Sequence, residues 1–279
     1  KDIAANDSTC KTKTFIFIRH GESDWNEVFN RGFNPASFVP RLIRSLFHEL
    51  SMIPTTDSLF FDSSLSSTGI TQAMEMVAFL ESDSSDRTRV LRGDTDGSSQ
   101  LSSVIVCSNL RRSLQTALLT LQARLKRTGE RVRMMTCLQE VTFNVDGIAL
   151  SKSREITPSM GEVGVHLPSD VLERSVDPTL NHGTKSIQSN GMIRMLEFLE
   201  WAFAQDEPVV VIAGGHSLYL RYMLRNFLPA DSDHIGKSKK LSNCGALQFS
   251  MTSAQLDAAP MYRIDPRSLQ VLYGGFTSH

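Results

Sequence analysis

Three short apolar segments separated by longer amphipathic stretches constrain the fold of this chain most strongly. Residues 14–18, 103–107 and 208–213 read TFIFI, SVIVC and PVVVIA. Apolar runs that are rich in β-branched residues and lack polar alternation are typical of strands buried on both faces of a parallel sheet. Residues 131–138 are a weaker strand candidate, and the alternation in residues 246–251 predicts an edge strand.

The stretches between these segments have the periodicity of amphipathic helices. In residues 109–127, leucine and alanine recur at spacings of three and four, which places them on one side of a helix. Asn109 is a candidate N-cap and Gly129 a candidate stop. Strands that alternate with helices predict an α/β fold, a three-layer sandwich with a mainly parallel central sheet and helices on both faces. The other candidate helices are residues 69–81, 191–203 and 217–228.

One domain is expected to account for residues 1–279, with an inserted segment at about 30–60 and a polar loop at about 82–100. Residues 151–190 carry scattered Pro, Gly and Ser without a sustained period, so we expect excursions above the sheet. No internal repeat is present in the sequence.

Within the insertion, residues 40–50 have the pattern of an amphipathic helix. Its apolar side comprises Leu42, Ile43, Leu46, Phe47 and Leu50. We expect this side to pack on the core, as apolar helix faces usually do. The alternative is a lid or partner-docking element near the functional site.

Composition excludes several classes of protein. The formal net charge of −1 does not favour nucleic acid as a partner, and no apolar run is long enough to span a membrane. The four cysteines are scattered without metal-ligand spacing, so we expect no metal site and a reducing, cytoplasmic compartment. Because the sequence begins at Lys1 rather than at methionine, an upstream segment can be missing and targeting stays open.

Each of the three apolar runs leads into cationic or imidazole side chains. The first ends at Arg19 and His20, the second precedes Arg111 and Arg112, and the third leads through two glycines to His216. Ligands of open α/β sheets bind beyond the carboxyl ends of the strands. Guanidinium groups, imidazoles and helix N-termini that meet there predict a pocket for a phosphate dianion.

The motifs resemble those of the histidine phosphatase superfamily, in its phosphoglycerate mutase-like branch. The matching stretches are RHGESDWN (19–26), DSSLSSTGITQA (62–73), SNLRRSLQTA (108–117) and GGHSLYLR (214–221). They occur in the family's order, and the resemblance runs from about residue 14 to about residue 251. It implies an enzyme that needs neither a metal nor another cofactor.

The resemblance also implies a role for each matching residue. His20 would be the nucleophile that forms a phosphohistidine. Arg19 and Arg112 would bind the phosphoryl oxygens, and His216 would complete the pocket. Glu140 would donate a proton to the leaving oxygen, which requires a raised pKa.

Further residues match positions where the family contacts phosphate or substrate. These are Gly21, Ser23, Asn26 and Ser217. Arg111, by contrast, is expected to be a solvated helix residue.

Two departures from the mutase pattern bear on the reaction. Residues 139–150 lack the arginine and tyrosine with which mutases hold phosphoglycerate, and residues 29–38 replace their threonine-glycine pair. A mutase needs such contacts to reorient a phosphorylated intermediate. We therefore expect a phosphatase acting on a phosphorylated small molecule or phosphoprotein. A phosphoglycerate mutase (an isomerase) and a non-catalytic phosphate-binding scaffold are the alternatives, and homo-oligomerisation is left open.

Overall fold

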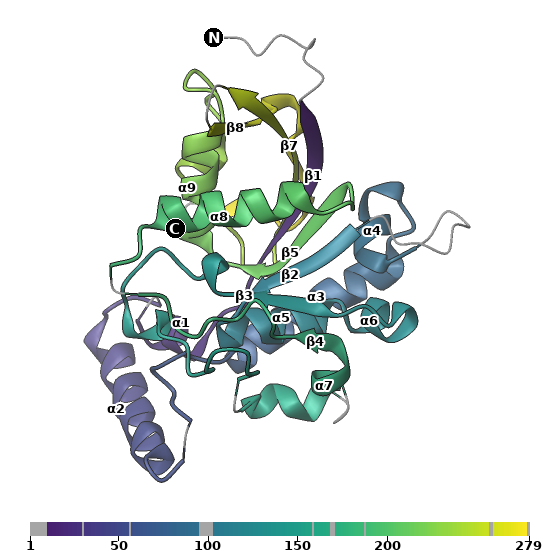
Figure 1. The fold of residues 1–279 in the computed structure, drawn as a ribbon. Coiled ribbons are helices and arrows are strands. Elements are labelled where there is room, and N and C mark those ends of the chain that lie inside the picture. The colour runs from purple at the N-terminus through teal and green to yellow at the C-terminus, as the bar shows by residue number, and fades with distance from the viewer. Residues whose placement is uncertain are drawn as a thin grey trace.

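A mixed eight-stranded sheet forms the centre of the molecule in the computed structural model (Figure 1). The structure describes residues 10–29, 31–55, 57–94, 103–157, 159–167, 171–186, 188–256 and 259–277. The strand order is β4-β3-β2-β5-β1-β7-β8, and β9 pairs with β7. The strands are β1 (Lys11–Arg19), β2 (Ser103–Ser108), β3 (Val132–Met135), β4 (Val176–Asp177), β5 (Val209–Gly215), β7 (Ala246–Leu256), β8 (Ala259–Ile264) and β9 (Gln270–Tyr273), while β6 (Lys240–Leu241) pairs with β10 (Phe276–Thr277).

Five neighbouring strands, β4, β3, β2, β5 and β1, are parallel, as the apolar runs predict. The prediction of an edge strand at residues 246–251 is wrong, because β7 pairs antiparallel with β1, β8 and β9. Its alternation instead reflects unequal burial of its two faces. Phe249 and Met251 are fully buried, whereas Gln248 and Ser250 are partly exposed.

Helices cover both faces of the sheet, which confirms the predicted three-layer sandwich (Figure 1). Ile16 and Ile18 of β1 join one buried cluster with α3 and α5, and Phe15 and Phe17 join the other with α8 and α9. The α-helices are α1 (Asp24–Phe29), α2 (Pro35–Met52), α3 (Ser67–Ser82), α4 (Arg89–Arg92), α5 (Arg111–Thr120), α6 (Gln122–Thr128), α7 (Val171–Ser175), α8 (Gly191–Ala204) and α9 (Ser217–Phe227). Short 3-10 helices span Asp86–Thr88, Thr136–Leu138, Val145–Gly147, Gly161–His166, Ile235–Lys237 and Pro266–Ser268.

The single helix predicted at residues 109–127 is two helices, α5 and α6, which meet at Leu121. Asn109 is not the N-cap, because its side chain donates hydrogen bonds to Asn181 Oδ1 and the Gly183 carbonyl. Leu110 takes the cap position without a side-chain hydrogen bond. Gly129 ends α6 with a φ of 71°, which confirms the predicted stop.

Two predicted loop regions contain regular structure. The described part of residues 82–100 includes α4, while residues 95–100 lie outside the described residues. Residues 151–190 contribute α7 and the strand β4, which pairs with β3 at the end of the sheet. Segments this short carry no detectable hydrophobic period in the sequence. The single-domain organisation stays a prediction.

None of the helices in the described ranges is long and apolar enough to cross a membrane.

Candidate active site

The ends of β1 and β5 bring His20 and His216 together. Arg19 pairs with Gly215 in the sheet, and the backbone N–H of His20 donates to the Gly215 carbonyl at 2.9 Å. The two imidazole centroids lie 5.1 Å apart, with the rings inclined at 61°. Both side chains are buried, so the two histidines predicted from the sequence form one site.

The two glycines before His216 are required by close packing. Gly214 has a φ of +77°, and a Cβ atom there would lie 2.1 Å from the Ser113 carbonyl oxygen. A Cβ atom on Gly215 would lie 2.3 Å from the Phe17 ring. Glycine therefore lets β5 end against α5 and β1. This packing places His216 Nε2 3.3 Å from the Ser113 hydroxyl.

The hydrogen bond of His20 determines its tautomer. Nδ1 lies 2.6 Å from the Gly21 carbonyl oxygen, which can only accept. Nδ1 therefore carries the proton, and Nε2 carries a lone pair. Burial, together with the positive charges of Arg112 and Arg19, lowers the pKa of His20 well below its ordinary value. The imidazole is thus neutral and nucleophilic near pH 7.

Arg19 and Arg112 bring buried positive charge to the same site. Arg112 Nη1 donates to the Asp146 carbonyl at 2.7 Å, and its Nη2 lies 3.3 Å from the Asp146 carboxylate. Arg19 Nη1 donates to the Leu241 carbonyl at 2.5 Å. Burial lowers the pKa of Arg19 to about 10, so this side chain still stays charged at neutral pH. Among the described residues, neither Nε atom has a hydrogen-bond partner, and both are buried donors suited to an anion.

Glu140 lies against the first turn of α9, directly after His216. Its Oε1 accepts from the backbone N–H groups of Val141 at 2.8 Å and Tyr219 at 3.0 Å, and its Oε2 accepts from that of Leu218 at 3.3 Å. Burial raises the pKa of Glu140, although these hydrogen bonds and the charge of Arg112 oppose the rise. Oε2 has the single, longer hydrogen bond, so it is the oxygen better placed to hold a proton.

Of the other residues matched to phosphate contacts, Gly21, Ser23 and Asn26 form hydrogen bonds within the protein. The Gly21 N–H donates to Thr116 Oγ1 at 3.1 Å. Ser23 is fully buried, and its hydroxyl accepts from the Asn26 N–H at 3.3 Å. Ser217 is the first residue of α9. Their contacts with phosphate stay predictions.

Several residues around the site carry no motif in the sequence. Arg194 of α8 is buried and donates to the carbonyls of Gln139 at 2.6 Å and Glu140 at 3.3 Å, which fixes the backbone that carries the proposed acid. The sequence offers one sign of this role, because Arg194 is a charged residue on the apolar side of a predicted helix. Lys185 donates to the Gly147 carbonyl at 3.1 Å, and burial lowers its pKa to about 8. The segment around Lys185 has no hydrophobic period from which the position of this side chain could have been predicted.

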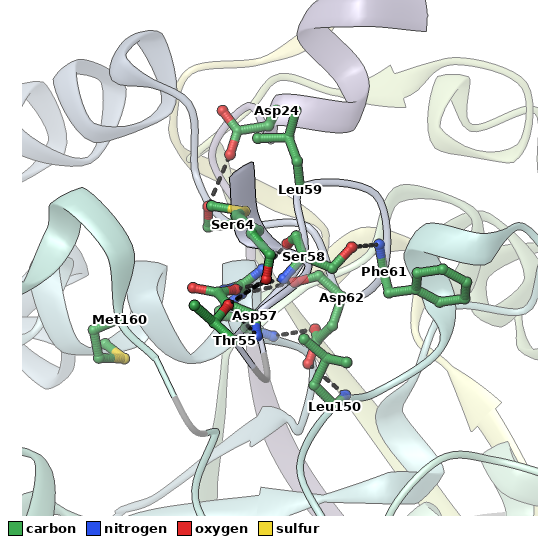
Figure 2. A network of polar contacts seen from close by, with 12 residues as sticks. Asp24, Thr55, Asp57, Ser58, Leu59, Phe61, Asp62, Ser64, Leu150 and Met160 are labelled. Carbon is green, nitrogen blue, oxygen red and sulfur yellow. Dashed lines mark hydrogen bonds and ion pairs between the residues drawn. The ribbon is translucent and has the colours of Figure 1, made fainter. Parts of the chain in front are cut away.

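The expectation that Arg111 is a solvated helix residue is wrong, because its side chain is only 2% exposed. It forms an ion pair with Asp57, and its Nε donates to the Asp62 carbonyl at 2.8 Å. The Asp62 carboxylate accepts from the backbone N–H groups of Arg111 at 2.6 Å and Leu150 at 3.0 Å. Figure 2 shows Asp57, Asp62 and Leu150 of this network. The end of the insertion and the 145–150 segment are thereby tied to the start of α5, next to Arg112.

In the part of the chain that the structure describes, no group of three or more His, Cys, Asp or Glu residues could hold a metal ion.

Comparisons with known proteins identify similar folds among solved structures. Neither a family model nor a curated protein matches the sequence. A mycobacterial glucosyl-3-phosphoglycerate phosphatase in complex with VO3 is 16% identical, with a TM-score of 0.44, over 91% of this chain and 97% of that chain. A protein described as mycobacterial hydrolase 1 is 17% identical over the same shares, also with a TM-score of 0.44. The native structure of mycobacterial glucosyl-3-phosphoglycerate phosphatase is 18% identical over 91% of this chain and 98% of that chain, with a TM-score of 0.42.

Proposed function

We propose that this protein is a phosphomonoester hydrolase that acts through a phosphohistidine on His20. The observation that carries the proposal is the hydrogen bond from His20 Nδ1–H to the Gly21 carbonyl. It leaves the lone pair on Nε2, in an imidazole whose lowered pKa keeps it neutral. The buried guanidinium groups of Arg19 and Arg112 supply positive charge for the phosphoryl oxygens.

In the first step, the Nε2 lone pair of His20 attacks phosphorus, and the bond from phosphorus to the ester oxygen breaks. The leaving oxygen takes the bond electrons and receives the proton of Glu140. The positive charges of Arg19 and Arg112 stabilise the charge on the transferring group. His216 Nδ1, which has no hydrogen-bond partner within the described ranges, is a further buried polar atom available to it.

In the second step, water attacks the phosphorus of the phosphohistidine. The ionised Glu140 takes a proton from that water, and the bond from phosphorus to His20 Nε2 breaks. Inorganic phosphate leaves, and both side chains return to their starting protonation states. Glu140 thus acts first as an acid and then as a base, a role suited to a carboxyl group whose pKa is raised.

Hydrolysis is preferred to a mutase reaction because the segment after Glu140 supplies no arginine or tyrosine to retain a phosphorylated intermediate. A phosphatase assay with an aryl phosphate, with and without bisphosphoglycerate, separates the two. The phosphatase releases phosphate in both conditions. Interconversion of phosphoglycerates that depends on bisphosphoglycerate would instead identify a mutase, and phosphate binding without turnover would identify a scaffold.

The matched variants His20→Gln and His166→Gln test the proposed role of His20. His166 is exposed, so its replacement should leave turnover unchanged. Loss of a nucleophile typically lowers kcat by at least about a thousandfold. Equal activity in the two variants would contradict the proposal.

The wild-type enzyme should also remain active after exhaustive chelation of metal ions. If chelation abolished the activity and a divalent ion restored it, that result would argue against the site described here.

A further inference from the structure

Helix α2 presents its apolar side to solvent. None of its residues is fully buried, and the prediction that this side packs on the core is wrong. Figure 1 shows α2 projecting from the body of the molecule. The exposed apolar residues, between 45% and 71% exposed, form what we call the outer face: Val39, Ile43, Leu46, Phe47, Leu50 and Ile53, the last of which directly follows the helix.

The side of α2 that is held to the body is partly buried and mixed in character, with Phe38, Leu42 and Met52 beside Arg41, Ser45 and Glu49. The Glu49 carboxylate accepts hydrogen bonds from the Ser58 hydroxyl at 2.7 Å and the Leu59 N–H at 2.6 Å. Arg41 donates to the Gly32 carbonyl at 2.9 Å and lines a cleft of about 440 Å³ between α2 and the body. Turning the outer face inward would break these bonds. The apolar side is therefore held outward by the fold.

The spacing of the outer face points to a helical partner. Positions 39, 43, 46, 50 and 53 follow steps of four, three, four and three residues. This is the 3.5-residue repeat of a coiled-coil seam, in which aliphatic side chains fit between those of a facing helix. A helix that lies on a lipid surface instead shows its polar side to water. In α2, Arg44 and His48 are exposed, but Arg41, Ser45 and Glu49 are partly buried against the protein, so only part of its polar surface faces water.

We propose that the outer face of α2 binds the same face of α2 in a second copy of this chain. A seam of this kind is self-complementary, because identical apolar residues can pair across a two-fold axis. It contains no charged residue that would be buried on pairing.

The size of the outer face is compatible with a dimer. Its six side chains expose roughly 600 Å² in each copy, when about 100 Å² is taken for each partly exposed large apolar side chain. A standard interface buries about 800 Å² from each partner. Phe33, which is 68% exposed and precedes α2, can supply part of the difference.

The test is the molecular mass of the full chain in solution, measured by sedimentation velocity from about 1 µM to about 100 µM, a range typical of moderate affinities. The wild type should form a dimer, and Leu46→Glu should shift its dissociation constant by at least about tenfold. Leu196→Glu is the matched control, because Leu196 is a leucine of similar exposure, 40% against 47%, on α8. Circular dichroism checks that both variants are folded.

A monomeric wild type throughout this range would overturn the proposal. So would a dimer that Leu46→Glu leaves intact, because the interface would then lie elsewhere. Flotation of a monomeric wild type with vesicles of neutral and anionic phospholipids, abolished by Leu46→Glu, would assign the outer face to lipid instead.

Disulfide cross-linking then tests the pairing itself. Leu46 is at the centre of the seam, so Leu46→Cys should cross-link two copies in either orientation. Ile53→Cys alone should cross-link only in a parallel pair, whereas an antiparallel pair should leave that variant unlinked and cross-link the double variant Val39→Cys/Ile53→Cys. Cys10, the one half-buried native cysteine among the four, is replaced by serine in this background. The absence of any cross-link from all three variants would contradict pairing through α2.

Discussion

Glu140 accepts a hydrogen bond from the backbone N–H of Tyr219, at 3.0 Å, and so attaches the proposed acid to the helix that begins just after His216. The N-terminal end of a helix favours a negative charge, which works against the burial that raises the pKa of Glu140. The same contact fixes the carboxyl group relative to His216. Glu140 and His216 are therefore connected through the first turn of α9.

Replacing Glu140 by glutamine should slow hydrolysis of alkyl phosphates far more than that of activated aryl phosphates. An alkoxide needs a proton as it leaves, and a positioned acid contributes about 10²–10⁴-fold to such a step. An activated phenolate leaves without that help. The comparison uses kcat/KM for both substrate types, because this ratio excludes the later hydrolysis of the phosphoenzyme. An equal loss for both types would place the acid elsewhere.

Asp146 should act as a positioning residue for Arg112. Its carboxylate lies 3.3 Å from the Arg112 Nη2 atom, and its carbonyl accepts from Nη1. Asp146→Asn should lower kcat/KM by about tenfold, because a misaligned guanidinium stabilises the transferring phosphoryl group less well. Inhibition by inorganic phosphate should weaken in parallel. The exposed Asp233 offers the control Asp233→Asn, and equal effects of the two changes would refute a specific role for Asp146.

Arg111 should contribute to stability rather than to catalysis. Arg111→Ala removes a buried cation and leaves the Asp57 carboxylate without its cationic partner, a kind of change that costs about 3–5 kcal/mol of unfolding free energy. Arg127→Ala provides the comparison, because the Arg127 side chain is 54% exposed and its pair with Asp94 should be worth at most about 1 kcal/mol. Urea unfolding of both variants measures the difference. A similar cost for both would show that the network in Figure 2 is not structural.

Stability should depend on pH through the buried histidines. Burial lowers the pKa of His216, as it does that of His20, below 6.5. Between the lowered value and 6.5 the unfolded chain binds more protons, so the unfolding free energy falls as the pH drops through this window. Each histidine contributes at most about 1.4 kcal/mol per pH unit.

The variant His216→Asn should therefore lose less stability than the wild type between about pH 7 and about pH 5. The raised pKa of Glu140 contributes with the opposite sign, since the folded state then binds the extra proton. That contribution is common to both proteins and cancels in the comparison. Parallel pH profiles for the two proteins would contradict a lowered pKa at His216.

The three central strands β1, β2 and β5 were predictable because they are continuous apolar runs, and the residues that follow such runs meet at one edge of the sheet. This relationship brought His20 next to His216 from positions far apart in the chain. The long amphipathic helices α3, α8 and α9 were also predictable, because the apolar residues that each of them buries recur at helical spacing in the sequence.

Other features depend on contacts that no local pattern encodes. Asp146 and Lys185 reach the site from irregular segments, so the sequence did not place them. Arg111 looked like a surface residue because its partners, Asp57 and Asp62, lie 54 and 49 positions earlier in the chain. The apolar side of α2 predicted burial, but its polar side holds the helix with that face outward.

Phosphoenzyme trapping tests the central claim most directly. With a radiolabelled aryl phosphate, rapid denaturation should yield protein label that is stable in alkali, labile in acid and located on the peptide containing His20. Glu140→Gln should accumulate more of this label, because the base for the second step is lost, and His20→Gln should accumulate none. Label on another residue, or undiminished turnover in His20→Gln, would contradict the account.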